Sequence, residues 1–170
     1  MQGLRTRSVV WLAGGLLAVS SAARADDCAA VTAAAIAQAK IPHAGTMAIT
    51  HPGKPADTSA TVVTATTAYA QVSGVWQAMP YSVQKEIDRI NRVSREASRR
   101  CSTAGAEAVD GEEATIYTTH ASIRDAAGDT RLWVSDRSGL PLKTETRFQD
   151  GMTLVATYRY DNVEAPAGVK

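Results

Sequence analysis

The spacing of apolar residues changes along the chain, and each change marks a predicted change of secondary structure. An alanine-rich segment from Cys28 to Lys40 predicts a helix, because alanine has the highest helix propensity and Pro42 ends the segment. Asp26 and Asp27 precede it, and either residue can cap its first turn. After Pro42 the chain changes to short extended segments, which indicate strands.

About four short strands are predicted between this helix and the next. They are rich in threonine and valine, which favour extended structure, and the turn signal Ser73-Gly74 separates the last two. We expect strands at Thr46 to His51, at Thr58 to Val72 as one strand or two, and at Val75 to Ala78. Consecutive strands with short connections predict an antiparallel meander.

A period of 3.6 residues begins at Ser82 and predicts a second, amphipathic helix. Apolar or small residues recur on one side of this helix, and basic residues lie on the other side. The first set is Val83, Ile87, Ile90, Ser94 and Ala97, and the basic set includes Lys85, Arg89, Arg92 and Arg99. The basic face can contact an anionic membrane, or it can be the solvated side of a surface helix.

The rest of the chain predicts five strands separated by four turns. Asp110-Gly111 and Asp150-Gly151 favour type I′ hairpins, because both central positions of that turn need a positive φ. The other two reversals are predicted at Ala126 to Asp129 and at Asp136 to Gly139. The strands are expected at Arg100 to Val109, Glu112 to Arg124, Thr130 to Ser135, Leu142 to Phe148 and Met152 to Tyr160.

This order of elements places the chain in the α+β class. An antiparallel sheet of this length twists and curls, so we expect an open, incomplete β-barrel with the two helices on its concave side. Leu132 and Val134 flank Trp133 and point opposite to it, so that strand is apolar on both faces. Either another element covers the second face, or Trp133 lines an accessible apolar surface.

The N-terminus has the pattern of a secretory signal peptide. Arg5 and Arg7 precede an apolar run from Val9 to Val19, and an Ala-Arg-Ala cleavage motif ends at Ala25. The apolar run is too short to span a bilayer, which takes about 20 residues. We therefore expect cleavage after Ala25, export to the periplasm, and a single domain over residues 26 to 170.

The exported segment has a near-neutral charge and two cysteines. Loss of three arginines with the signal peptide leaves 15 basic and 17 acidic residues, which argues against a nucleic-acid-binding protein. Cys28 and Cys101 are the only cysteines, and the oxidising periplasm favours a disulfide between them. Closing a loop of this length stabilises a fold by roughly 4 kcal/mol.

The sequence shows no pattern of catalytic or metal-ligating residues. His43, His51 and His120 lack partners at the spacings of a zinc site, and no G-x-S-x-G segment or glycine-rich phosphate loop occurs. Glu112 and Glu113 are neighbours on a predicted strand and point to opposite faces. We therefore expect a protein that is not an enzyme and has no metal or cofactor.

Several segments resemble the lipoprotein-localisation-factor (LolA-like) superfamily and a related group of exported proteobacterial proteins. They are Val109 to Tyr117 (VDGEEATIY), Leu132 to Ser135 (LWVS) with Gly139 to Lys143 (GLPLK), and Tyr158 to Pro166 (YRYDNVEAP). The resemblance covers roughly residues 28 to 166. It implies a periplasmic module with an open antiparallel barrel, helices as a lid, and an apolar cavity for acyl chains or a hydrophobic partner.

These observations predict a non-enzymatic periplasmic protein that holds a lipid, a lipoprotein acyl chain or a similar amphiphile between sheet and helices. The alternative is an envelope interaction or sensor module whose cavity is filled by its own side chains. The candidate lining residues are Met47, Ile49, Tyr69, Trp76, Trp133, Met152, Leu154 and Tyr158.

Overall fold

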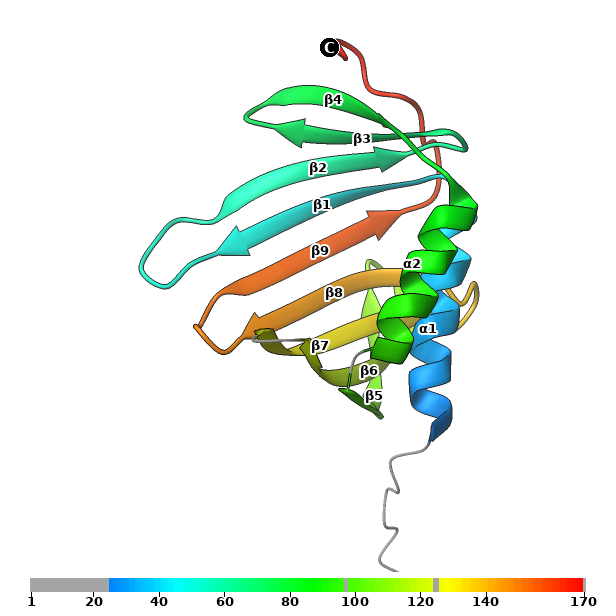
Figure 1. Ribbon diagram of the computed structural model, residues 1–170, viewed down its shortest axis with the longest axis vertical. Helices are drawn as coiled ribbons and strands as arrows, with labels where there is room; N and C mark the ends of the chain where they lie inside the picture. The colour runs from blue at the N-terminus through cyan, green and yellow to red at the C-terminus, as the bar shows by residue number, and fades with distance from the viewer. Residues whose placement is uncertain (1–24, 97, 124–125, 170) are drawn as a thin grey trace, which may run out of the picture.

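The computed structural model describes residues 25–96, 98–123 and 126–169, which form two helices and one nine-stranded antiparallel sheet (Figure 1). All but the last residue of the predicted signal peptide lie outside this part of the chain. The elements are α1 (Ala25–Ala39), β1 (His43–Thr50), β2 (Asp57–Val63), β3 (Thr67–Val72), β4 (Val75–Pro80), α2 (Val83–Glu96), β5 (Ser98–Val109), β6 (Glu112–Ile123), β7 (Ala126–Ser135), β8 (Pro141–Phe148) and β9 (Thr153–Arg159).

Neighbouring strands follow the order β4-β3-β2-β1-β9-β8-β7-β6-β5, so β4 and β5 are the edges of the sheet. The sheet is curved and does not close into a barrel, because these two edge strands do not pair with each other (Figure 1). The last strand, β9, pairs with the first, β1, and thereby joins the two meanders. The predicted α+β class and open antiparallel sheet are confirmed.

One predicted reversal is wrong. Ala126 to Asp129 belong to β7, whose ladder with β6 extends as far as the pair Ile123 and Ala126. The strand stays extended through the pair His120 and Asp129, whose Nδ1 and Oδ1 atoms are 2.7 Å apart. Residues 124–125, which connect the two paired strands, lie outside the described part of the chain.

Positive φ angles distinguish the two predicted type I′ turns. Asp110 and Gly111 have φ values of 51° and 82°, so this prediction is confirmed. At Asp150-Gly151 only the glycine has a positive φ, of 83°, so the type I′ prediction there is wrong. The carboxylate of Asp150 instead accepts a hydrogen bond from the backbone N–H of Met152 at 2.9 Å, which forms an Asx turn.

The strand register divides the sheet into two faces. Leu132 and Val134 of β7 pack against Ala34 of α1, and we call this side of the sheet the helix face. Side chains alternate along a strand, so Trp133 belongs to the other side, the opposite face. Both faces of β7 are therefore covered.

Trp133 is the centre of the core on the opposite face, where it is 1% exposed. Its Nε1–H donates to Glu107 Oε2 at 3.0 Å, and Arg131 and Lys143 lie 4.8 and 4.5 Å from its ring centroid. The apolar residues around the ring are Val109, Ala114, Ile116 and Leu142. Of the two sequence alternatives for Trp133, coverage by other elements is the one that the structure shows.

The helix α1 is fixed between the sheet and α2. Cys28 of α1 forms the predicted disulfide with Cys101 of β5, and the Asp27 carboxylate accepts hydrogen bonds from Thr103 at 2.9 and 3.2 Å. The second helix, α2, packs mainly against α1, where the hydroxyls of Thr32 and Ser94 are 3.2 Å apart. The start of α1 is thus tied to the edge strand β5.

A buried hydroxyl positions Glu112 beside the turn after β7. Ser135 is 2% exposed, donates to Glu112 Oε1 and accepts from the N–H of Ser138 at 2.9 Å. Arg137 Nη2 donates to Glu112 Oε2 at 3.1 Å. The hydrogen bond from Ser135 is the main reason that the pKa of Glu112 lies below its usual value, and Arg137 lowers it further.

We expect Glu112 to contribute to a loss of stability in acid. A carboxyl whose pKa is depressed by folding stabilises the fold above its unfolded pKa, and this contribution is lost as the pH falls through the folded pKa. The melting temperature of Glu112→Gln, followed by circular dichroism from pH 6 to pH 3, should therefore fall less steeply than that of the wild type. Glu113→Gln, an exposed neighbour, serves as the control. A Glu112→Gln curve parallel to the wild-type curve would contradict the prediction.

Candidate functional site

The structure divides the predicted lining residues between the two faces of the sheet. The helix face carries Met47, Ile49, Leu154 and Tyr158, and the opposite face carries Tyr69, Trp76 and Trp133. Met152 lies in the turn between β8 and β9, just before β9 begins. The eight residues therefore do not line one cavity, and Trp133 is buried in the core.

Four large apolar side chains gather on the helix face at β1, β8 and β9, and we call them the β1–β9 patch. Ile49 pairs with Leu154 across the two strands, and Met47 pairs with Ala156. Phe148 lies on the same face of β8, two residues beyond the partner of Leu154. These four large side chains are all partly exposed.

The helices lie away from this patch. Figure 1 shows both helices across one end of the strands, whereas the C-terminal end of β1 and the start of β9 lie at the other end. The contacts of α1 with the sheet are mainly to β5, β6 and β8. Ile49 and Leu154, at the far ends of their strands, are therefore left without a helix over them.

A polar rim separates the patch from α1. The Tyr160 hydroxyl accepts from Gln38 Nε2 at 3.0 Å and donates to the carbonyl of Pro141. Burial raises the pKa of Tyr160 well above its usual value, so this hydroxyl stays neutral. The hydroxyls of Tyr158 and Thr144 lie 3.4 Å apart beside it. An apolar surface next to neutral hydroxyl groups matches the two parts of an amphiphile.

The free edge of the sheet carries further exposed apolar residues. Val72, Val75 and Met79 are 50%, 38% and 51% exposed, and all three lie on the helix face of β3 and β4. Val72 pairs directly with Val75 at the hairpin. The sequence pattern did not single out Met79 or Phe148. The side of the sheet on which Met79 and Phe148 lie depends on how their strands pair with the neighbouring strands. The alternation of residues along a single strand does not reveal that pairing.

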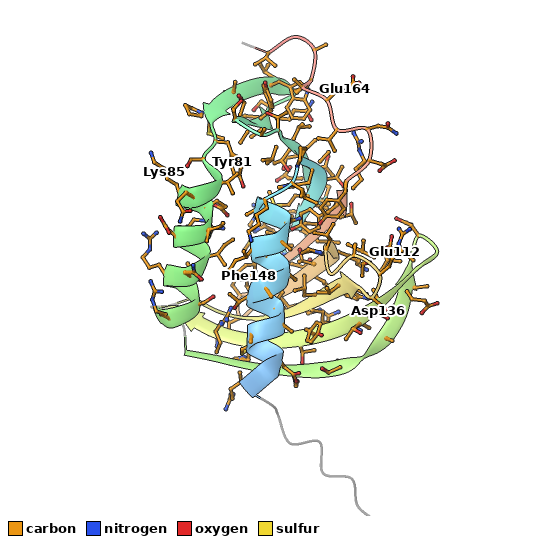
Figure 2. The ribbon with its side chains drawn as sticks, turned by 90° about the vertical axis from the view of Figure 1, so that its right-hand side faces the viewer. Tyr81, Lys85, Glu112, Asp136, Phe148 and Glu164 are labelled. Carbon is orange, nitrogen blue, oxygen red and sulfur yellow. A yellow bond between two sulfur atoms is a disulfide. The ribbon has the colours of Figure 1, made fainter. Side chains whose placement is uncertain are left out.

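The predicted basic face lies on the outer side of α2. Lys85 and Arg92 are exposed, and Figure 2 shows Lys85 pointing away from α1. Arg89 donates from Nε to Glu86 at 2.9 Å, and this hydrogen bond lowers the pKa of Glu86. Arg99 was assigned to this face wrongly, because it belongs to β5 and donates to Thr32 on α1 at 2.9 Å. Contact between this face and an anionic membrane stays a prediction.

The histidines lie apart from one another in the structure. His120 pairs with Asp129, and Nδ1 of His43 lies 2.9 Å from the carbonyl oxygen of Ile41. Within the described ranges, no group of three or more histidine, cysteine, aspartate or glutamate side chains could hold a metal ion. Of the helices described, none is long and apolar enough to cross a membrane.

Comparison with known proteins gives a likeness of fold. No protein-family model and no curated protein matches the chain. LprF from Mycobacterium bovis is 12% identical with a TM-score of 0.50, over 88% of this chain and 100% of LprF. MucB, in the MucA/MucB complex of Pseudomonas aeruginosa, is 16% identical with a TM-score of 0.50, over 85% of this chain.

The chain spans 62% of that MucB structure. NE2245, a LolA superfamily protein from Nitrosomonas europaea, also matches, at 13% identity and a TM-score of 0.29 over 73% of this chain and 90% of NE2245. The TM-scores of 0.50 for LprF and MucB show a likeness of fold, and sequence identities this low show nothing about function. The chain shares the fold of LprF and MucB, and it has the open antiparallel sheet and the two helices that the sequence resemblance implied.

Proposed function

We propose that this chain is a non-enzymatic binding module of the bacterial periplasm that holds the acyl chain of an amphiphile on the helix face of its sheet. The observation that carries the proposal is the β1–β9 patch, a cluster of large apolar side chains that is partly exposed and lies away from both helices. The signal-peptide pattern and the disulfide support the periplasm as its compartment.

The size and composition of the core support the same conclusion. The buried side chains are mostly small, and among the residues whose burial the structure describes Trp133 is the only large apolar one with less than 2% exposure. Ala156 is buried while its cross-strand partner Met47 stays partly exposed. Apolar area on β1 and β9 therefore remains available for a ligand, which would gain about 0.8 kcal/mol for each methylene group removed from water.

We expect the affinity for lysophospholipids to rise about fourfold with each added methylene until the patch is filled. Isothermal titration calorimetry with a series of chain lengths, on protein purified without detergent, measures this slope. Ile49→Ser/Leu154→Ser should weaken binding of the longest ligand at least about tenfold, because it replaces the paired apolar side chains at the centre of the patch.

The matched control is Val155→Ser, the same kind of change one residue along β9 on the opposite face. It should leave the affinity unchanged. Thermal unfolding of all variants establishes that they are folded. Affinity that does not depend on chain length, or equal losses in Val155→Ser and the double variant, would contradict acyl-chain binding.

The exposed residues of β3 and β4 favour one second candidate, a module that binds an envelope protein. Val75 and Met79 lie on a free edge strand, where a segment of a partner can add as a further strand. MucB, which has the same fold, is solved in complex with MucA. If lysophospholipids do not bind and an envelope protein cross-links to β4 in cells, this second function replaces the first.

A further inference from the structure

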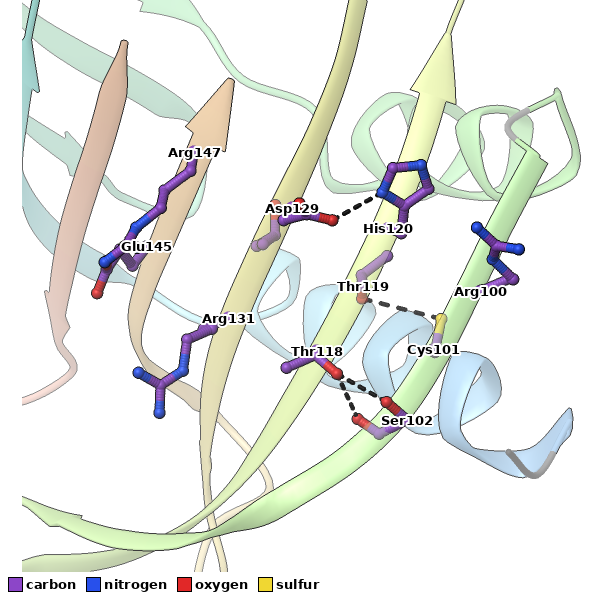
Figure 3. Close-up of a pocket in the computed structure, with 11 residues that line it drawn as sticks. Arg100, Cys101, Ser102, Thr118, Thr119, His120, Asp129, Arg131, Glu145 and Arg147 are labelled. Atoms are coloured by element: carbon purple, nitrogen blue, oxygen red, sulfur yellow. Dashed lines mark hydrogen bonds and ion pairs between the residues drawn. The ribbon is translucent and has the colours of Figure 1, made fainter. Parts of the chain in front are cut away.

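A groove of about 520 Å³, with charged and hydroxyl-bearing residues in its lining, lies on the opposite face across β5 to β8 (Figure 3). By strand register Arg100, His120 and Arg131 lie on the opposite face, whereas Cys101 and Thr119, which also border the groove in Figure 3, belong to the helix face. The sheet therefore separates the charged side chains of the groove from the β1–β9 patch. We call this groove the arginine groove. Its ionisable residues are Arg100, His120, Asp129, Arg131, Glu145 and Arg147.

Both carboxylates of the groove already have a partner inside it. Asp129 Oδ1 lies 2.7 Å from His120 Nδ1, as the dashed line in Figure 3 marks. Glu145 accepts hydrogen bonds from Nη2 and Nε of Arg147, at 3.0 and 3.2 Å. Neither carboxylate forms an ion pair with Arg100 or Arg131 among the described residues.

Two arginines in the groove keep free guanidinium groups. Arg100 and Arg131 are exposed, and neither forms an ion pair with a residue that the structure describes. Arg131 is nevertheless held in place, because its guanidinium lies 4.8 Å from the ring centroid of buried Trp133. Stacking uses the face of a guanidinium and leaves its N–H groups free to donate to a ligand.

The register places these two arginines at opposite corners of a small polar surface. Arg100 pairs with His120, whereas Arg131 pairs with Thr118 and lies two strands away from Arg100. Strand spacing and rise put their Cα atoms roughly 12 Å apart. Figure 3 shows the two guanidinium groups on opposite sides of the groove, so a ligand shared by both requires the exposed Arg100 side chain to turn toward Arg131. The hydroxyls of Ser102 and Thr118, 2.7 Å apart, lie in the same groove.

We propose that the arginine groove binds the phosphate group of a ligand, with Arg100 and Arg131 as the charged contacts. Guanidinium groups donate two hydrogen bonds to phosphate oxygens in one plane, and hydroxyls supply further donors. The guanidinium N–H groups of Arg100 and Arg131 are free to donate, whereas both carboxylates already have partners, so the groove favours a ligand that accepts hydrogen bonds, such as an oxyanion. This site is independent of acyl-chain binding, since it lies on the other face of the sheet.

Titration with inorganic phosphate tests the proposal directly. The chain, expressed with its own N-terminal segment and purified without detergent, should bind phosphate saturably, and Trp133 emission should change as Arg131 engages the ligand. Arg100→Gln/Arg131→Gln should weaken binding at least about tenfold, because it removes two charge-assisted contacts. Lys85→Gln/Arg92→Gln removes the same charge from exposed positions on α2 and should bind as the wild type does.

Two results would overturn the site: absence of saturable phosphate binding, or equal weakening in both double variants. Phosphatidylglycerol vesicles distinguish the sources of the phosphate. Sedimentation with vesicles that is lost in Arg100→Gln/Arg131→Gln and competed by phosphate identifies a lipid headgroup as the source. Phosphate binding without sedimentation identifies a soluble phosphorylated ligand. The lysophospholipid affinity of Arg100→Gln/Arg131→Gln tests the helix face separately.

Discussion

Cys28→Ala/Cys101→Ala should lower the free energy of unfolding by about 4 kcal/mol. The disulfide joins residues 73 positions apart, and its loss restores conformational entropy to the unfolded chain. This is a large fraction of the 5–15 kcal/mol that typically stabilises a single domain. Its share of the total stability is large here because most of the buried side chains are small and bury little apolar area.

Urea unfolding followed by circular dichroism measures this loss, and the melting temperature should fall by roughly 10–15 °C. Wild-type protein reduced with dithiothreitol is the matched control and should unfold near the same urea concentration as the double variant. Agreement between the two assigns the effect to the cross-link and not to the alanine side chains. A loss below about 1 kcal/mol in both samples would show that the hydrogen bonds between Asp27 and Thr103 hold α1 without the disulfide.

The disulfide and its neighbours also limit how α1 can act. Cys28 fixes the first turn to β5, and the carbonyl of Ala39 at the other end accepts from the Tyr81 hydroxyl at 2.8 Å. Gln38 donates to Tyr160 beside the patch. With both ends held, α1 is fixed against the rest of the chain, whereas the LolA-like resemblance implies helices that act as a lid.

Local signals in the sequence predicted most of the elements, because each depends on a few neighbouring residues. Asp110-Gly111 defines its turn through backbone angles alone, and the change of period at Ser82 marks the start of α2. Local sequence signals gave a wrong prediction where hydrogen bonding to a neighbouring strand determines the conformation. Ala126 to Asp129 look like a turn in sequence, yet the ladder with β6 keeps them extended.

The candidate site was less predictable, because its faces depend on contacts between distant segments. Met47 lies opposite Ala156 only because β1 pairs with β9, more than 100 residues later. No periodicity within either strand carries that information. Tyr69 and Trp76 were grouped with Met47 for the same reason, and the register places them on the other face. Arg99 was assigned to α2 because its spacing continued the helical period beyond the end of the helix.

The second large effect is expected for Trp133→Ala, which should cost about 3–5 kcal/mol. The ring is 1% exposed, and its removal leaves a cavity among Ile116, Ala114 and their neighbours. It also removes the indole N–H that donates a hydrogen bond to Glu107, and it removes the aromatic ring against which Arg131 lies. Packing, a hydrogen bond and a cation–π contact are lost together.

Trp76→Ala is the matched control for this substitution. Trp76 is the same residue type on the same face, but it lies partly exposed on the edge strand β4. It should cost below about 1 kcal/mol, because water already reaches much of its ring. Urea unfolding followed by far-ultraviolet circular dichroism compares the two variants without relying on tryptophan emission. Similar small losses in both would place Trp133 outside the core and return it to the residues that line an accessible surface.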